Sequence, residues 1–401
     1  MNDVELFELG KKFESERNYT EAVKYYQEAA KLGNINAQLN LGLCYDLGIG
    51  VETNKKEAIN WYLSAAIKGN KYAQSNLANI LYDIRNYEEA VKWYRKSADQ
   101  GNDYAQYRMG LAYEYGNGVP KDYAEAAKWY ILAAEQGYVT AQNNLGNLYR
   151  DGKGVLKNYA EAVKWFLKAA EKGDSSSQNS LACCYCDGTG VAKDLSEAFR
   201  WFKRAAEQNH LHAQFNLGLT YENGCGVSKD YVEAAKWYSK AAERGHVSAQ
   251  VCLGNCYYEG VGVTKDYEEA VKWYRKAADK GNVIAQNNLA NRYKNGEGVT
   301  RDTSEAFRLY KLSAESGYEL AQKNLLRLCE DLKNWDEAVK WYIKFAENGN
   351  AEYQYKLGLC YFDGRGVLKD RKTAKYWFRK AADKGHQEAK SKLDGFWALF
   401  C

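Results

Sequence analysis

The feature that most constrains the fold of this chain is an aromatic pair that returns at a fixed interval. In the stretch KWYRKAADKG the pair is Trp-Tyr, and equivalent pairs recur along the 401 residues, 36 apart in eight cases and 32 apart in two. The pairs begin at Tyr25, Trp61, Trp93, Trp129, Trp165, Trp201, Trp237, Trp273, Leu309, Trp341 and Trp377. A constant period of this size indicates a repeat architecture in which each unit packs on its neighbours. We therefore expect one continuous array over 1–401, although length alone would suggest two or three globular domains.

Each unit predicts two antiparallel helices joined by a glycine-rich connector. In one unit, apolar residues share a helical face at positions 141, 145, 148 and 149, and a second face at 162, 165, 166 and 169. The connector has the form GxGV and begins at Gly48, Gly116, Gly152, Gly188, Gly224, Gly260, Gly296 and Gly364. Glycine turns before a helix can cradle phosphate, but such a loop normally occurs once and follows a strand. Eight copies with a variable middle residue and no preceding strand indicate a connector instead.

Helix ends are also marked in the repeat. Asn158 and Glu161 predict an N-cap whose carboxylate reaches back to the cap N–H. The pair recurs as Asn18/Glu21, Asn54/Glu57, Asp122/Glu125, Asp230/Glu233 and Asp266/Glu269. Glycine ends ten of eleven hairpins, and the exception, Asn209, is the next most tolerant of a left-handed conformation. The predicted hairpins end near 33, 69, 101, 137, 173, 209, 245, 281, 317, 349 and 385, followed by a capping helix over 386–401. In that helix Phe396, Trp397 and Phe400 are expected to cover the apolar end of the array.

A small residue in each first helix and the aromatic pair in each second helix predict the core. The small residues are Gly42, Ala78, Gly110, Gly146, Ala182, Gly218, Gly254, Ala290 and Gly358. The aromatic side chains are expected to fill the space between layers, because such stripes at helical spacing are usually core. Leu309 and Leu326 break this frame near 309–335, so we expect altered packing or curvature there.

The units resemble the Sel-1-like repeat, a relative of the tetratricopeptide repeat, over essentially the whole chain. The shared frame is A-x-x-x-L-G-x-x-Y-x-x-G-x-G-V-x-x-D-Y-x-E-A-x-x-W-Y-x-K-A-A-x-x-G. The hairpins at 4–33, 72–101 and 321–349 lack the GxGV insertion and have tetratricopeptide-like connectors. The resemblance implies an all-α fold, an α/α solenoid wound as a right-handed superhelix of eleven hairpins. It also implies a scaffold or adaptor for protein partners.

Cysteine usage and the N-terminal sequence indicate a cytoplasmic protein. The start, MNDVELFELGKK, has no apolar stretch with a cleavage site, and no apolar run reaches transmembrane length, so no membrane insertion is expected. Some Sel-1-like proteins carry a disulfide in each repeat, but this chain has no cysteine in its second helices. Four cysteines share one core position and are interpreted as small buried apolar residues: Cys44, Cys184, Cys256 and Cys360.

No cofactor, metal or catalytic activity is predicted. Cys183 and Cys186 lie three residues apart, but a zinc site usually needs a second ligand pair, for which His210 and His212 are the nearest candidates. Catalysis needs a singular constellation, whereas nearly every polar residue here has a counterpart one period away. The formal net charge is only +4, without a Lys/Arg stripe, which argues against nucleic acid as a partner.

The remaining surface predicts a binding face for a protein or peptide. In tetratricopeptide relatives the first helix of each hairpin lines the concave groove, and here that helix carries recurrent asparagines, often three residues apart on one face. A carboxamide can both donate to and accept from a peptide backbone. The predicted partner-binding residues are Asn40, Asn76, Asn79, Asn144, Asn147, Asn216, Asn255, Asn288, Asn291 and Asn324. The alternative is that these side chains serve packing between turns. The functional hypothesis is a non-catalytic scaffold that binds an extended segment; the alternatives are a helical-repeat RNA-binding protein or a regulatory subunit of a partner enzyme.

Overall fold

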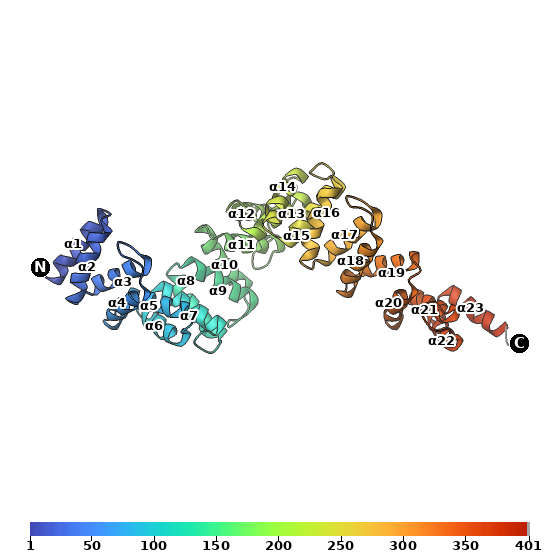
Figure 1. Cartoon of the computed structure of the whole chain (residues 1–401), viewed down its shortest axis with the longest axis horizontal. Helices are drawn as coiled ribbons and strands as arrows, with labels where there is room; N and C mark the ends of the chain where they lie inside the picture. Colours follow the sequence, from blue (N-terminus) through green and yellow to red (C-terminus); the bar gives the residue numbers. More distant parts are fainter. Residues whose placement is uncertain (399–401) are drawn as a thin grey trace. The chain divides into compact units, whose positions relative to one another are not determined.

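The computed structural model describes residues 1–398, with side chains described as far as residue 394, and within them the chain forms 23 helices and no strand (Figure 1). The first helices of the hairpins are α1 (Asp3–Ser15), α3 (Ile35–Leu47), α5 (Lys71–Asp83), α7 (Asp103–Tyr115), α9 (Val139–Asp151), α11 (Ser175–Asp187), α13 (Leu211–Asn223), α15 (Val247–Glu259), α17 (Val283–Asn295), α19 (Glu319–Asp331) and α21 (Ala351–Asp363). The second helices are α2 (Tyr19–Lys31), α4 (Lys55–Ile67), α6 (Tyr87–Asp99), α8 (Tyr123–Glu135), α10 (Tyr159–Glu171), α12 (Leu195–Glu207), α14 (Tyr231–Glu243), α16 (Tyr267–Asp279), α18 (Thr303–Glu315), α20 (Trp335–Glu347) and α22 (Arg371–Asp383). The final helix is α23 (Gln387–Ala398).

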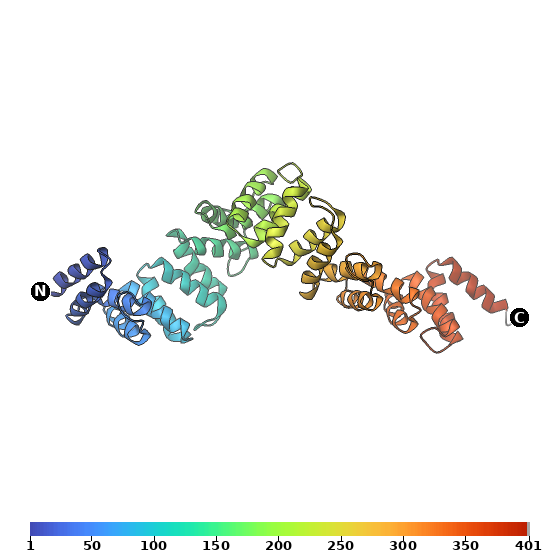
Figure 2. The same cartoon turned by 45° about the horizontal axis from the view of Figure 1, so that its top comes forward.

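The predicted all-α solenoid of eleven hairpins and a terminal helix is confirmed. The chain divides into two compact units, Met1–Thr220 with Gly224–Ser228, and Tyr221–Asn223 with the chain from Lys229 onward. Within each unit, helices pack against their neighbours in chain order, as the second view shows (Figure 2). The handedness of the superhelix and its treatment as a single domain stay predictions. The proposed covering role of Phe396, Trp397 and Phe400 lies outside the described side chains.

Both glycines of the GxGV connector have a structural reason, and all eight connectors lie between the two helices of a hairpin, as predicted. Gly152 ends α9 in a left-handed conformation, with φ +70°, and its N–H donates to the carbonyl of Leu148 at 2.8 Å. Gly154 also has φ +70°, and a Cβ there would lie 2.1 Å from the backbone of Tyr123, the first residue of α8. The second glycine therefore lets the connector approach the preceding hairpin.

The predicted capping pairs are half right. Asn158 accepts a hydrogen bond from the N–H of Glu161 at 3.1 Å, as expected for an N-cap. The carboxylate of Glu161 does not reach back, because the N–H of Asn158 already donates to the carbonyl of Tyr149 at 2.9 Å. That carboxylate instead pairs with Lys164 at 2.5 Å. The same arrangement replaces the predicted reciprocal contact at Glu21, Glu125, Glu233 and Glu269.

The aromatic core forms as predicted, and it explains the small residue in each first helix. A Cβ on Gly146 would lie 2.6 Å from the ring of Phe166, and one on Gly254 would lie 2.7 Å from the ring of Tyr274. Both rings belong to the second helix of the same hairpin and are buried. The small residue is thus required by a ring rather than by a neighbouring backbone.

A row of buried glutamines, which was not predicted from the sequence, ties each hairpin to the one before it. Gln142, only 3% exposed, donates through Nε2 to the carbonyl of Ala134 at the end of α8, at 3.0 Å. Equivalent bonds are made by Gln38, Gln74, Gln106, Gln178, Gln214, Gln250, Gln286, Gln322 and Gln354. The carbonyl of Ala134 also accepts the N–H of Gly137 at 3.0 Å, so the glutamine adds a second hydrogen bond at the helix end and fixes the stacking register.

The irregular joint near residues 309–335 departs in its packing, as expected. Leu326 is buried where most other first helices carry glycine or alanine. The two helices α19 and α20 contact each other less than α17 and α18, or α21 and α22, do. A larger side chain at the contact point separates the helices of this hairpin.

Candidate protein-binding face

The candidate face consists of three positions on each first helix, counted from its small residue: two residues before it, one after it and four after it. In the hairpin of α9 and α10, whose small residue is Gly146, these positions are Asn144, Asn147 and Arg150. All ten predicted asparagines are at the first two positions and are half-buried. The face is therefore accessible in part and packed in part.

A buried tyrosine of the second helix organises these positions in most hairpins. The ring lies against the small residue at Gly10, Gly42, Gly110 and Gly254, and the hydroxyl donates to a polar side chain of the first helix. The acceptor is acidic, at the third position, for Tyr26 (Glu14), Tyr62 (Asp46), Tyr130 (Glu114), Tyr238 (Glu222) and Tyr342 (Glu330). Where no acid stands there, the asparagine at the second position accepts instead. This is seen for Tyr94 with Asn79, Tyr274 with Asn255 and Tyr310 with Asn291, at 2.5, 2.7 and 2.6 Å.

The asparagines at the first position contact the preceding hairpin. Burial raises the pKa of the Tyr130 hydroxyl above its usual range, and a hydrogen bond with Asn144 partly offsets this. Asn40 and Asn76 interact with Tyr26 and Tyr62 in the same way. Further along the chain the amides join one another, Asn216 to Asn179 at 3.1 Å, Asn288 to Asn255 at 3.3 Å and Asn324 to Asn287 at 2.8 Å. The packing alternative thus has specific contacts at most of the predicted residues.

Asn147 is the exception among the asparagines at the second position. The ring over its small residue belongs to Phe166, which has no hydroxyl. Within residues 1–398 the side chain of Asn147 makes no hydrogen bond, whereas Asn291 at the equivalent position accepts from Tyr310. Asn147 therefore has no hydrogen-bond partner within the described residues, whereas Asn79, Asn255 and Asn291 at the same position accept from a tyrosine.

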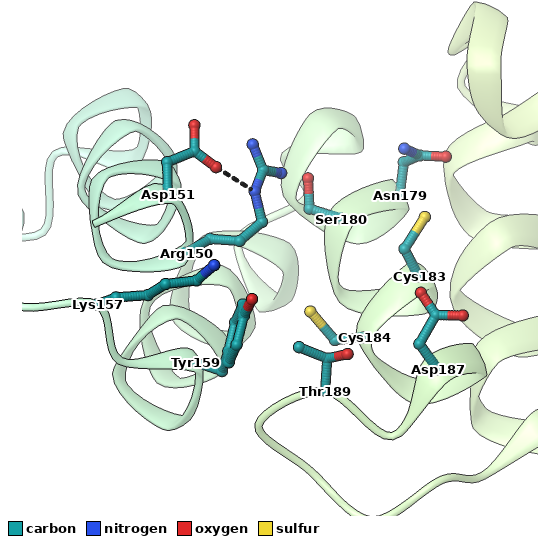
Figure 3. A pocket seen from close by; sticks show the side chains of 10 residues that line it. All are labelled: Arg150, Asp151, Lys157, Tyr159, Asn179, Ser180, Cys183, Cys184, Asp187 and Thr189. Carbon is teal, nitrogen blue, oxygen red and sulfur yellow. Dashed lines mark hydrogen bonds and ion pairs between the residues drawn. The ribbon is translucent and has the colours of Figure 1, made fainter. Parts of the chain in front are cut away.

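A pocket of about 570 Å³ lies between the hairpin of α9 and α10 and that of α11 and α12 (Figure 3). Arg150 and Lys157 point into it from one side, and α11 supplies Ser180, Cys183 and Asp187 on the other. This site was not predicted from the sequence. The sequence feature that could have indicated it is the combination, in one hairpin, of a basic residue at the third position (Arg150) and phenylalanine in place of tyrosine (Phe166).

The basic side of this pocket is partly neutralised within the chain. Arg150 Nε donates to Asp151 Oδ1 at 2.9 Å, and Lys153 Nζ lies 3.3 Å from Asp151 Oδ2. The hydrogen bond from Arg150 lowers the pKa of the Asp151 carboxyl, so that the carboxylate is ionised at neutral pH. The outer nitrogens of the guanidinium make no hydrogen bond within the described part of the chain.

Cys183 and Cys186, the candidate pair for a metal site, are partly buried free thiols. Burial raises the pKa of the Cys183 and Cys186 thiols to about 11, which keeps both protonated at neutral pH. Among residues 1–398, no three His, Cys, Asp or Glu side chains are grouped so that they could hold a metal ion. Cys44, Cys184, Cys256 and Cys360 are buried thiols, as predicted.

None of the helices in the described part of the chain has the length and apolar character needed to cross a membrane.

A family model described as the Sel1 repeat matches the chain eleven times. The matched segments are 5–34, 35–70, 71–102, 103–138, 139–174, 175–210, 211–246, 247–282, 283–318, 332–350 and 351–386. The matches follow the hairpins, and the shortened tenth match begins after α19, in the irregular joint.

Solved structures with the same repeat cover much or all of the chain. A protective antigen of uropathogenic Escherichia coli strains, which displays an SLR fold, is 34% identical over 100% of this chain and 88% of its own, with a TM-score of 0.80. A Sel1 repeat protein from Oxalobacter formigenes is 35% identical over 60% of this chain and 96% of its own, with a TM-score of 0.55.

Two curated relatives match over short segments. The ERAD-associated E3 ubiquitin-protein ligase component HRD3A of Arabidopsis thaliana is 43% identical over 54 residues, which are 13% of this chain and 8% of that protein. Chitin synthase regulatory factor 3 of Schizosaccharomyces pombe is 39% identical over 62 residues, 16% of this chain and 7% of that protein. The chain thus spans less than a tenth of either curated relative.

Proposed function

The chain belongs to the Sel1 repeat family, and on this premise we propose that it is a non-catalytic scaffold that binds an extended segment of another protein along its first-helix face. Proteins with this repeat generally serve as interaction scaffolds or adaptors. The curated relatives are named as a ligase component and as a regulatory factor, which fits such a role. The cysteines packed as small apolar side chains support a reducing, cytoplasmic setting.

The observation that carries this proposal is the orientation of the asparagines at the second position. In Asn79, Asn255 and Asn291 the carbonyl oxygen accepts a tyrosine hydroxyl. Their Nδ2 groups donate no hydrogen bond within residues 1–398. A carboxamide has two N–H donors, so the tyrosine fixes each side chain and leaves its donors for a partner. The same contacts that pack the asparagines therefore orient them for binding.

The spacing of the repeat suits an extended partner. Packed helices stand about 8–10 Å apart, and an extended chain advances about 3.3 Å per residue. About three residues of the partner would therefore pass each first helix, so successive asparagine donors would meet carbonyls on the same edge of the segment.

The experiment compares asparagines with and without an internal role. The partner is first captured on the purified chain and then titrated by calorimetry against wild type, Asn147→Ala and Asn291→Ala. Each lost hydrogen bond is expected to weaken binding by about 0.5–1.5 kcal/mol. Only Asn291→Ala should also lower the unfolding midpoint, because it leaves the Tyr310 hydroxyl without its acceptor.

The matched control is Asn60→Ala, a change to an exposed asparagine on the second helix α4. It should leave the affinity unchanged and should not lower the unfolding midpoint. Equal affinity of wild type and Asn147→Ala, with helicity intact by circular dichroism, would count against binding through these asparagines.

A further inference from the structure

The two hairpins that meet at the junction of α9 and α10 with α11 and α12 both carry phenylalanine at the position of the usual tyrosine of the second helix. Phe166 and Phe202, like Phe378 in the hairpin of α21 and α22, stand where the other eight hairpins carry a tyrosine that donates to its first helix. No hydroxyl is present to engage the third position of α9. That position holds Arg150, where five of those hairpins hold the acid that accepts from tyrosine.

The equivalent site at the junction of α19 and α20 with α21 and α22 is occupied by side chains of the chain itself. There Glu330 occupies the third position and accepts from Tyr342. Lys356, at the position equivalent to Ser180, reaches Glu330 at 2.8 Å. The remaining pocket is about 210 Å³. A carboxylate of the chain itself thus fills that junction and is held by a facing base.

At the junction beside Arg150 the third position of the first helix holds a base instead of an acid. No carboxylate from that position therefore lies between the two hairpins. Ser180, which faces Arg150 across the pocket, is too short to fill it, and the volume is about 570 Å³ (Figure 3). Asp151 engages only the Nε edge of Arg150. The outer guanidinium nitrogens and the Lys157 ammonium can therefore still receive an anion, and an arginine fork is well suited to a carboxylate.

We propose that this pocket anchors the side chain of an aspartate or glutamate within the partner's extended segment. Arg150 and Lys157 would bind the carboxylate, and the Ser180 hydroxyl would donate to it. Asp187, on the opposite wall, would accept a backbone N–H of the same segment, which favours an internal acidic residue over a small free anion. This inference rests on the proposed function and adds the chemistry of one partner residue.

The test uses the full chain and a phage-displayed library of random dodecapeptides held between two fixed flanks, so that no free terminal carboxylate is present. Enriched peptides should share an aspartate or glutamate at one position. Synthetic copies are then titrated by fluorescence polarisation. Replacing that acid by its amide should weaken binding to wild type by about 10-fold or more, as expected for a hydrogen bond to a charged group.

Three variants make the result specific. Arg150→Gln should reduce the preference for the acidic peptide over its amide copy to the part that Lys157 and Ser180 supply. Arg150→Glu should select peptides without the acid. Arg200→Gln is the matched control, because Arg200 also pairs with a carboxylate, Glu197, but lies on the second helix α12; it should behave as wild type.

The outcomes separate the two proposals. Peptides that bind without any acidic preference, or whose acidic preference is as large in Arg150→Gln as in wild type, overturn the anchor and leave segment binding intact. If the affinity depends on Arg150 only for synthetic peptides that have a free terminal carboxylate, the bound group is the chain terminus. That result overturns the assignment of the carboxylate to an aspartate or glutamate side chain. A failure to enrich any peptide overturns the proposed segment binding and the anchor with it.

Discussion

Replacing Gln142 by glutamate tests the buried bond that fixes each hairpin on its predecessor. The two side chains have the same shape, so packing is unchanged, but an ionised glutamate has no donor for the carbonyl of Ala134. The bond is 3.0 Å long, and Gln142 is 3% exposed. A buried carboxyl is ionised less readily than one in water, so the pKa of the new side chain in the folded state should be raised.

The size of the effect should depend on pH. Below the unfolded pKa of about 4.3 the protonated acid can still donate to Ala134, and Gln142→Glu should be within about 1 kcal/mol of wild type, the worth of one hydrogen bond. Above it the unfolded chain ionises first, so stability is lost as pH rises, by about 1.4 kcal/mol per unit until the folded pKa is reached. Between pH 4.5 and 6.5 the added loss should be about 2–3 kcal/mol.

Urea unfolding followed by circular dichroism at pH 4.5, 5.5 and 6.5 measures this difference. Gln387→Glu is the control, since Gln387 is exposed at the start of α23 and a carboxylate there needs no desolvation. A difference between Gln142→Glu and wild type that stays constant over this range would refute the interpretation of the glutamine as a buried donor.

Three further results are expected. Gly154→Ala should destabilise the chain by about 1–3 kcal/mol more than Gly173→Ala, because both have positive φ but only the first would place a Cβ against backbone; equal unfolding midpoints would contradict this. Burial disfavours ionisation of Glu337, but hydrogen bonds from Lys311 and Lys340 outweigh it and lower the pKa of its carboxyl. The stabilisation, roughly 1 kcal/mol, should be present above pH 4.5 and lost as pH falls through the folded pKa, so Glu337→Gln should differ from wild type at pH 7 and converge with it near pH 3 in thermal melts. Phe166→Tyr should stabilise the chain by about 0.5–1.5 kcal/mol by giving Asn147 the hydroxyl that Asn291 receives; a lower unfolding midpoint would show that the two positions are not equivalent.

Periodicity made most of the fold predictable. A fixed spacing of aromatic residues, small residues and glycines locates every helix pair. The glycines are required by the backbone conformation of the connectors, and the small residues by the space that the aromatic rings occupy. Asn209 shows how far this extends: it was expected to adopt the left-handed conformation of the usual glycine, and its φ is +63°. Local rules of this kind need no knowledge of the neighbouring hairpin.

Polar contacts were predicted less well because several partners compete for each group. The N–H of Asn158 had two candidate acceptors, the Glu161 carboxylate and a carbonyl of the first helix, and only the structure shows that Tyr149 supplies it. The asparagines pose the same problem. Nothing in the sequence around Asn79 or Asn291 says that a tyrosine 15 or 19 residues later donates to its oxygen.

The same competition suggests where a repeat protein of this kind can bind. Where a tyrosine hydroxyl or an ion pair binds the polar side chains between two hairpins, those donors and acceptors are no longer available to a partner. At the junction of Glu330 and Lys356 an incoming carboxylate would first have to displace one that is already bound. At Arg150 the third position holds a base instead of the acid, and Asp151 pairs only with the Nε edge of its guanidinium. A partner's acidic residue can therefore bind the outer guanidinium nitrogens without displacing a bound carboxylate, so departures from the repeat, rather than its most regular units, are where specificity should arise.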